Sequence, residues 1–542
     1  MDLWRLLRRD ALRRLKPLLL LAFLTAAVNL TLLTSINGAL LSLQDGPTLE
    51  RLLLVFLLSA FLWRFVQNWL MSVASKRIQA ALGALRMGLL RRALAAELPD
   101  VMAVGPARIA AAAGAELQLL SQAVPTLVIS FQSVAAILLC LLYLASLSGL
   151  AVMIVLGVLM LGGVVVARCA MRLEALAEEI HGIETDLTER SDHILKTLRE
   201  CKLNRRRRDD ALADIAAGTE GLRQDRHSFA VQYSRYFMAN ELTYYFALAG
   251  IVFLLPALAA TDIATVVLAA HAAAFIAYPV ITIVTSYPSY LGAETAARSY
   301  LAIEERLADP RRSPAVAADF SGFRTLALED LTFRHAGRGA AGSFTVGPVT
   351  LAVERGTVVF VTGHNGSGKS TLIHMLLGLY PAQRGALAVD GVPVPPEAMA
   401  SYRDLFSVVF SDSHVTRQLH GVGDLEDGFA EELLDLLEIG DKVGLDGRAF
   451  TTVDLSQGQR KRLALMAALL ERKPVLVLDE WAADQSPYFR RKFYREILPW
   501  MKARGITVIA VTHDDAYFDA ADVQLQVERG SVLRLPDPAA VA

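Results

Sequence analysis

The sequence predicts two parts, an all-α transmembrane domain of six helices followed by an α/β domain with a mostly parallel sheet. Of the 542 residues, 54% are apolar and the mean hydropathy is +0.39, which is high for a soluble protein. Before residue 301, the apolar residues gather in runs long enough to cross a bilayer. From residue 323 onward, short β-branched runs such as GTVVFVTG and GITVIAVTH alternate with helical segments.

Six apolar segments are predicted to cross the membrane. The links between the first and second, third and fourth, and fifth and sixth segments are short and contain no Lys or Arg, whereas the links 76–121 and 173–241 are long and rich in arginine. Positive charge marks the cytoplasmic side, so both termini and both long links are expected in the cytoplasm. The six segments are residues 17–43, 50–75, 122–147, 149–172, 242–260 and 263–290.

The regions on either side of these segments complete the domain division. The chain begins MDLWRLLRRDALRRLK, where arginines alternate with leucines, and we interpret residues 1–16 as an amphipathic helix on the membrane surface. The transmembrane domain is assigned to 17–301. A polar, proline-bearing linker is assigned to 302–322, and the α/β domain to 323–542.

Charge and cysteine content exclude several classes of function. The formal net charge is −1, so the overall charge gives no reason to expect a nucleic-acid partner. The arginine run at 205–208 is interpreted as topogenic charge of a cytoplasmic loop. Cys140, Cys169 and Cys201 lie far apart and form no CxxC pair, which argues against a disulfide framework or a zinc site.

A phosphate-binding loop is predicted in the α/β domain. The stretch GHNGSGKST follows the strand TVVFV, opens the helix STLIHMLLGLY and fits the pattern G-x-x-x-x-G-K-[ST]. Glycine-rich backbone N–H groups and a helix N-terminus bind phosphate oxygens. We expect the lysine to reach the β- and γ-phosphates, the serine after it to hold Mg²⁺, and the threonine to contact the α-phosphate. The predicted ATP-binding residues here are Gly363, Asn365, Gly366, Ser367, Gly368, Lys369, Ser370 and Thr371.

The stretch VLVLDEWAADQ ends an apolar strand with two acids. The strand pattern indicates burial on both faces, and buried charge is costly unless it is neutralised. In P-loop folds, an aspartate at this position holds Mg²⁺, usually through water, and this role is predicted for Asp479. Glu480 is placed to take a proton from the attacking water, so it is the predicted catalytic base. An ordinary pair of helix N-cap acids is the alternative.

The stretch DLSQGQRKRLAL resembles the LSGGQ signature of ABC transporters, and the order and spacing of motifs support this resemblance over 323–542. It implies that Ser456, Gly458 and Gln459 contact ATP bound to a second copy of the chain. It also implies that His513, in VTHDD, orients the γ-phosphate and the attacking water. A homodimer with two composite ATP sites follows from the same resemblance.

Three positions depart from the general ABC pattern. Ser411 stands where a glutamine usually approaches Mg²⁺, and its short side chain reaches the metal only through water. The aromatic residue that stacks on adenine is replaced by His335, with Phe333 as the competing candidate. The loop that usually reads SALD is Ala-Asp-Gln-Ser at 483–486, so contacts across a dimer are expected to differ. Trp481 is interpreted as a packing residue.

These departures point to a subfamily. The segments DEWAADQ, LFSVVFSD, GQRKRLAL and HDDAYFDAAD resemble bacterial half-transporters that export cyclic peptides and peptide siderophores, and RECKLNRRRR resembles their inner-loop segment. The resemblance implies an ATP hydrolase coupled to export of a cyclic or knotted peptide, or of a peptide siderophore, across the bacterial inner membrane. A siderophore importer or a lipid translocator of the same architecture is the alternative. A soluble ATPase acting on DNA or ribosomes is disfavoured by the six segments.

Two polar residues in the apolar segments are candidate substrate contacts. Arg64 interrupts the second segment, and an intramembrane arginine is costly enough to favour a cavity-facing, substrate-pairing role. The alternative is a side chain that snorkels to the inner leaflet. His271, in the sixth segment, either faces the transport path or hydrogen-bonds between helices. A neutral-polar and aromatic lining is expected from Asn29, Asn37, Gln67, Gln132, Tyr244, Tyr245, Tyr278 and Tyr287.

Overall fold

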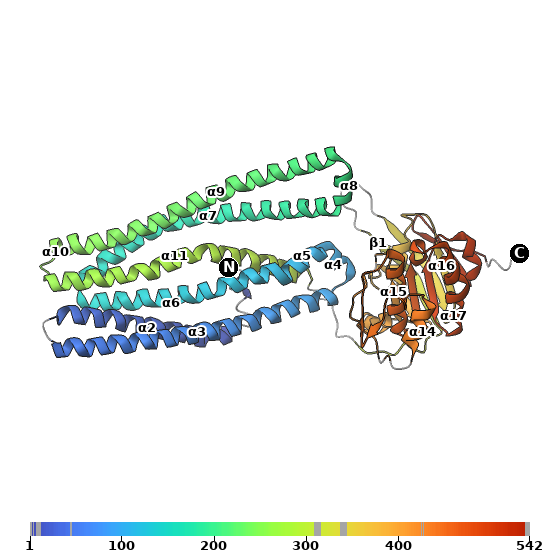
Figure 1. Cartoon of the computed structure of the whole chain (residues 1–542), viewed down its shortest axis with the longest axis horizontal. Coiled ribbons are helices and arrows are strands. Elements are labelled where there is room, and N and C mark those ends of the chain that lie inside the picture. Colours follow the sequence, from blue (N-terminus) through green and yellow to red (C-terminus); the bar gives the residue numbers. More distant parts are fainter. Residues whose placement is uncertain are drawn as a thin grey trace. The chain divides into compact units, whose positions relative to one another are not determined.

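The computed structural model describes residues 3, 5–6, 12–43, 46–307, 316–335, 344–412, 414–423, 425 and 428–536. The chain forms two compact units (Figure 1). The first comprises Met1–Ala96 and Ala103–Ala308, and the second comprises Glu97–Met102 and Asp309–Ala542. Half of the predicted amphipathic helix at 1–16 lies outside the described residues, and its last five residues form the start of α2.

The first unit is entirely helical among its described residues, as predicted. Four of the six predicted apolar segments each lie within one long helix. The first segment extends two residues past the end of α2, and the fifth continues from α9 through η2 into α10. The long helices are α2 (Leu12–Leu41), α3 (Gly46–Ala95), α6 (Leu117–Leu147), α7 (Gly149–Lys196), α9 (Arg205–Ala249) and α11 (Ile263–Arg306). The short elements are α4 (Leu98–Val104), α5 (Pro106–Ala111), η1 (Ala112–Glu116), α8 (Leu198–Leu203), η2 (Gly250–Leu254) and α10 (Leu255–Leu258).

Five helical segments of the described residues are long and apolar enough to cross a membrane. Helix α3 is not among these five. It holds the second predicted segment, which contains Arg64, Gln67 and Asn68. The five segments are Leu20–Leu41, Pro106–Leu147, Gly149–Lys196, Arg205–Leu258 and Ile263–Arg306.

Polar side chains begin three of the long helices. The side chain of Ser148 caps α7, that of Asn204 caps α9 and that of Asp262 caps α11, each by accepting a backbone N–H three residues ahead. Such caps satisfy N–H groups that have no partner inside the helix. Helix α11 runs to Arg306, five residues beyond the predicted domain end at 301. Ile303 is buried in this extension, so its apolar contact continues the helix into the predicted linker.

The second unit has the predicted α/β fold. Its six-stranded sheet has the order β12-β11-β3-β10-β9-β6 and is parallel except for the β11–β12 pair. These strands are β3 (Val358–Thr362), β6 (Phe406–Val409), β9 (Val475–Asp479), β10 (Thr507–Val511), β11 (Val523–Glu528) and β12 (Ser531–Arg534). An antiparallel sheet that the sequence did not predict has the order β2-β1-β4-β5. Its strands are β1 (Thr325–Arg334), β2 (Thr345–Glu354), β4 (Arg384–Val389) and β5 (Val392–Pro393).

Short elements surround the two sheets. The helical ones are α12 (Lys369–Leu376), η3 (Pro396–Ala398), α13 (Met399–Arg403), α14 (Phe429–Leu436), α15 (Gln457–Leu470), η4 (Trp481–Asp484), α16 (Pro487–Lys492), η5 (Phe493–Ile497), α17 (Leu498–Ala503) and η6 (Asp515–Ala520). A small hairpin is formed by β7 (Leu445–Asp446) and β8 (Ala449–Phe450).

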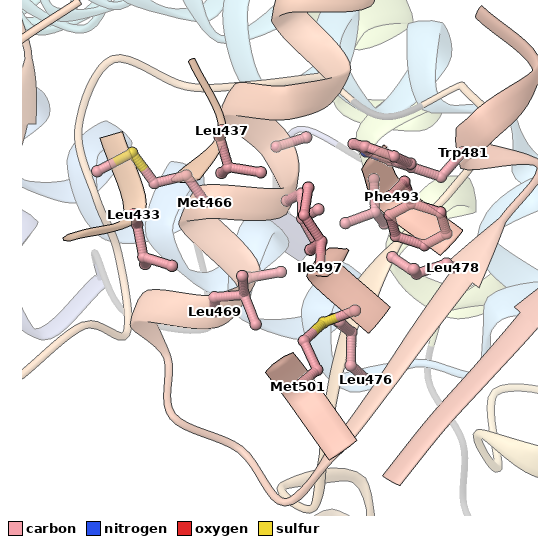
Figure 2. Packing of buried hydrophobic residues seen from close by; sticks show 14 of the residues in the cluster. Leu433, Leu437, Met466, Leu469, Leu476, Leu478, Trp481, Phe493, Ile497 and Met501 are labelled. Carbon is pink, nitrogen blue, oxygen red and sulfur yellow. The ribbon is translucent and has the colours of Figure 1, made fainter. Parts of the chain in front are cut away.

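Strand β9 has a core on each face, which confirms the predicted burial. Leu476 and Leu478 pack into one cluster with side chains from α14, α15, η5 and α17 (Figure 2). Val475 and Val477 point into the other cluster, which includes α12 and the antiparallel sheet. Because both faces are filled, the position of β9 and of the acids at its end is fixed by packing.

Candidate nucleotide-binding and catalytic site

The glycines of the phosphate loop are required by its backbone. Gly363, Gly366 and Gly368 have φ values of 143°, 76° and 110°, which L side chains rarely adopt. A Cβ on Gly363 would lie 2.3 Å from the backbone oxygen of Val527, and one on Gly368 would lie 2.8 Å from Val346 Cγ2. The loop is therefore shaped by close backbone approaches that only glycine allows.

The donors of this loop fit a phosphate chain. Lys369 Nζ donates to the carbonyl oxygens of Gly363 and His364 at 3.0 and 3.1 Å, which holds the ammonium over the loop. Within the part of the chain that the structure describes, the buried Ser367 hydroxyl has no hydrogen-bond partner, so a ligand oxygen would satisfy it. Gly368 is the N-cap of α12, whose first N–H groups favour an anion. Asn365, Ser370 and Thr371 lie on the accessible side of the same loop and helix.

The sheet brings the acids of β9 close to this loop. Strand β10 lies between β3 and β9, and Val511 pairs with Val361 on one side and Asp479 on the other. The carboxyl ends of all three strands therefore meet at one edge. Lys369 lies near enough to Asp479 for its charge to oppose part of the rise that burial causes in the pKa of this acid.

Asp479 is a buried carboxylate with a favourable place for a cation. It is 6% exposed, and burial together with the charge of Glu480 raises its pKa above the ordinary value. Hydrogen bonds from the side chain and backbone of Ser411 act in the opposite direction. A divalent ion would compensate the buried charge of Asp479. Ser411, which replaces the usual glutamine, is thus in direct contact with this acid.

Glu480 and His513, the two predicted catalytic residues, lie next to each other. Glu480 has a left-handed backbone with a φ of 50°, and its N–H donates to Val511 O at 3.1 Å. Its Oε1 lies 3.3 Å from His513 Nε2, and both side chains are accessible to a ligand. A carboxylate and an imidazole at this separation are able to share a proton or to orient a water molecule.

The predicted signature residues begin α15. Ser456 and Gln459 form a reciprocal capping box, in which each side chain accepts the other's backbone N–H. Gly458 lies against the loop after β9, since a Cβ there would be 2.9 Å from Asp484 O. Gln485 Nε2 donates to Gly458 O at 3.1 Å. The signature end of α15 is thus attached to the loop that carries Glu480.

Lys461 is a functional candidate that the sequence analysis missed. It is 8% exposed, and its Nζ donates to Glu480 O at 2.9 Å and to Asp484 Oδ2 at 2.7 Å. Lys461 O accepts from Trp481 Nε1 at 2.7 Å, and Trp481 is 1% exposed, which confirms it as a packing residue. The spacing of Lys461 with Ala464, Leu465 and Ala468 puts it on the buried face of α15, a signal available in the sequence.

The aromatic candidates for adenine differ in their accessibility. Phe333 is 6% exposed and stacks on Tyr380 with ring centroids 4.5 Å apart, so its ring faces are occupied by the core. His335 Nε2 lies 3.0 Å from Thr371 Oγ1, beside the phosphate loop. Phe344, which the sequence analysis did not single out, is exposed. Its ring stacks on that of His335, with ring centroids 6.4 Å apart.

Arg64 and His271 lie in the first compact unit, hereafter the membrane unit, whereas the predicted nucleotide-binding residues lie in the second, hereafter the ATPase unit. Arg64 is exposed on the surface of α3. His271 Nδ1 is hydrogen-bonded to Asn37 Oδ1, and Asn37 Nδ2 donates to Tyr143 OH at 2.9 Å. His271 therefore connects α11 with α2, which corresponds to the interhelical alternative. A substrate role for Arg64 stays a prediction.

Comparison with known proteins agrees with this geometry. The family model described as ABC transporter matches residues 346–483. ATP-binding protein SyrD of Pseudomonas syringae pv. syringae is 30% identical over 490 residues, which cover 88% of this chain and 86% of that protein. An ATP-dependent lipid A-core flippase of Aromatoleum aromaticum is 30% identical over 226 residues, covering 38% of this chain and 36% of the flippase.

A solved structure supports the fold over the whole chain. The structure of a bacterial Atm1-family ABC exporter with ATP bound superposes with a TM-score of 0.78 at 16% identity, covering 97% of this chain and 95% of that one. Fold and site define an ATPase unit joined to a helical membrane unit. The chain belongs to the ABC transporter family and has the architecture of an exporter-type half-transporter. It binds ATP and couples its hydrolysis to transport across a membrane.

The contacts of Lys461 generate a testable prediction. Lys461→Met keeps the length of the side chain but removes the donor to Glu480 O, so the left-handed turn at Glu480 loses its support. Because small displacements of a catalytic group are costly, we expect kcat for ATP hydrolysis to fall about 10²-fold with little change in KM. Steady-state ATPase assays on the full-length protein measure both constants.

The matched control is Arg460→Met, which alters the neighbouring, exposed side chain of the same helix. This variant should retain wild-type kcat and KM. An unchanged kcat in Lys461→Met, or a rise confined to KM, would contradict the assigned role.

Proposed function

We propose that two copies of this chain form a homodimer in the bacterial inner membrane that exports a peptide-like substrate at the expense of ATP. The substrate class is a cyclic or knotted peptide, or a peptide siderophore. The observation that carries the ATPase part is the convergence of the glycine-rich loop, Asp479 and the Glu480–His513 pair at one sheet edge. The short links between helix pairs would face outward, and both termini and the ATPase unit would be cytoplasmic.

The phosphate loop is assigned to the triphosphate of ATP. Lys369 would bind the β- and γ-phosphates, and the buried Ser367 hydroxyl and the backbone N–H groups of the loop would complete the cradle. Mg²⁺ would be held by Ser370 and, through water, by Asp479. The ion would neutralise charge on the phosphate oxygens. Ser411 would orient Asp479 toward it, because Ser411 already hydrogen-bonds that carboxylate.

Hydrolysis is assigned to the Glu480–His513 pair. Glu480 would accept a proton from the attacking water, and His513 would orient the γ-phosphate. Their 3.3 Å separation supports action on the same group. For adenine, we assign the exposed ring of Phe344 together with His335, since both rings of the Phe333–Tyr380 pair are already packed together. His335 would thus contact both the base and, through Thr371, the α-phosphate end of the site.

Each site would be shared by two chains. Ser456, Gly458 and Gln459 lie at the start of α15 and contact no part of the chain's own phosphate loop in any described hydrogen bond. This placement supports a role across a dimer. ATP bound at such an interface favours the closed arrangement, and that difference in affinity is what drives the membrane helices between two states.

The cargo assignment rests on the subfamily resemblance and on the lining of the membrane unit. Tyr233, Tyr236, Tyr287 and Tyr290 form a series of ring contacts with centroids 5.7 to 6.3 Å apart. Tyr236 is buried, and the half-buried rings of the other three are suited to apolar and hydrogen-bonding groups of a peptide. A lipid translocator is the second candidate, because the lipid A-core flippase shares 30% identity over 226 residues. A siderophore importer of the same architecture is the third.

The assignment of the base predicts the effect of Glu480→Gln. The amide keeps the shape of the side chain but accepts no proton, so ATP hydrolysis should fall about 10²–10⁴-fold while ATP binding persists. Single-turnover hydrolysis and retention of labelled ATP measure the two effects. Lys369→Ala is the control, because it should weaken binding itself. Near wild-type turnover in Glu480→Gln would place the base elsewhere.

Shared sites predict how two inactive chains behave together. Mixing Lys369→Ala chains with Ser456→Arg chains concentrates both defects in one site of each heterodimer and leaves the other site intact. Isolated heterodimers should therefore hydrolyse ATP faster than either mutant homodimer. Activity equal to the mean of the two homodimers would contradict shared sites.

The transport direction is tested in inverted membrane vesicles with a labelled cyclic peptide. We expect ATP-dependent accumulation inside the vesicles, since their exposed face is the original cytoplasmic face. Arg64→Ala should weaken peptide stimulation of the ATPase without changing its basal rate, whereas Arg51→Ala on the same helix should not. Loss of preloaded peptide on ATP addition would instead identify an importer.

A further inference from the structure

The membrane unit contains a cavity of about 510 Å³ between helices α6, α7, α9 and α11. This volume is within the range of about 300–1,000 Å³ that is typical of small-molecule sites. The nucleotide residues do not contribute to it. Its polar lining includes Glu116, His181, Glu184, Arg226 and Ser299.

Three irregularities of the helices border this cavity. Glu116 is the last residue of the π-helical turn η1, a rare conformation that is frequent at functional sites. Pro288 lies inside α11, where it removes a backbone hydrogen bond of the helix. Gly292 adds no side chain, and a Cβ there would meet nothing within 4 Å. Open space beside a π-turn, a proline and a glycine is consistent with a built site.

Of the acids that line the cavity, Glu116 is only partly satisfied by its neighbours, although His181 lies near enough to attract it. Glu184 is paired with Arg226 across α7 and α9. Glu116 Oε1 accepts from Ser299 Oγ at 2.6 Å, but Glu116 Oε2 is buried and has no hydrogen-bond partner among the described residues. A buried carboxylate oxygen without a partner is costly, and a cation with N–H donors would satisfy it.

Apart from Thr295, the remaining lining is apolar. Leu119, Ile180, Phe229 and Leu291 face the same space. Phe229 and Leu291 also pack into the cluster that contains Tyr236 and Tyr287. Aromatic faces next to a carboxylate favour an ammonium or guanidinium group carried on an apolar body.

We propose that this cavity binds a basic side chain of the transported peptide, with Glu116 as the residue that pairs with its ammonium or guanidinium group. The inference rests on the proposed function, because it specifies the cargo as an amphipathic peptide with a cationic side chain. It differs from the expectation of a carboxylate partner at Arg64, which concerns a separate position in α3.

The test compares two synthetic cyclic hexapeptides of leucine and tyrosine that carry either one lysine or one acetyl-lysine. Binding to the full-length protein in lipid nanodiscs is measured by calorimetry, without ATP. The wild type should bind the lysine peptide about 10- to 100-fold more tightly than the acetylated one, the range expected for a hydrogen bond to a charged group. Glu116→Gln should abolish this preference and leave basal ATPase activity unchanged.

Two further variants distinguish the effect of the Glu116 charge from the effect of the cavity volume. Glu178→Gln alters an acid of α7 that does not line the cavity and that pairs with Arg298 at 2.6 Å, so it should keep the wild-type preference. Gly292→Leu should fill the cavity and weaken binding of both peptides. Retained basal ATPase activity shows that each variant is folded.

Binding measurements test the cavity assignment, and transport measurements test the proposed peptide export. Equal binding of the two peptides to the wild type, no binding of either, or an unchanged preference in Glu116→Gln would overturn the cavity assignment. A lysine preference that depends on Glu116, without ATP-dependent transport of the peptide, would support the cavity and contradict peptide export.

Discussion

The buried carboxylate of Asp479 is the constraint on which the ATPase unit depends. It ends a strand whose two faces are filled by separate hydrophobic clusters, so the acid has no freedom to move toward solvent. Burial raises its pKa, and the Ser411 hydrogen bonds and the nearby Lys369 only partly compensate. A cation at this position would lower the free energy of the charged form. Mg²⁺ bound with the nucleotide would therefore supply electrostatic compensation that the polypeptide alone lacks.

A second constraint connects helix α15 with the loop that carries Glu480. Lys461 belongs to the signature helix α15, yet its ammonium binds the carbonyl of Glu480 and the carboxylate of Asp484. The cost of burying the Lys461 ammonium is offset because its contacts with Glu480 O and Asp484 Oδ2 replace hydrogen bonds to water. In a homodimer with shared sites, one chain would present its signature to one ATP and its Glu480 to the other. The same lysine would then link the geometry of both sites.

The membrane unit uses irregular helices where a transporter needs space. The π-turns η1 and η2 adjoin α6 and α9, and Pro125, Pro279 and Pro288 lie inside α6 and α11; these three helices are 31 to 45 residues long. Around them, tyrosine contacts and the Glu116 cavity provide polar and aromatic groups within a mostly apolar unit. The charged residues of the cavity belong to the links 76–121 and 173–241, which are expected in the cytoplasm, so they carry no cost of burial in lipid. A ligand bound there would replace the backbone and side-chain hydrogen bonds that the irregular helices lack.

The sequence by itself determined the features that depend on local spacing. The apolar runs predicted the helical membrane unit, and the Gly363–Ser370 motif and the strand before Asp479 predicted the nucleotide site, because each lies within a short continuous segment. Only the tertiary structure decided which side chains meet across long separations. It buried Phe333 against Tyr380, joined His335 to Thr371, and placed Lys461 under Glu480. It also brought Glu116 to Ser299, which lies 183 residues away. These contacts arise from the packing of distant elements, and no local pattern of residues encodes that packing.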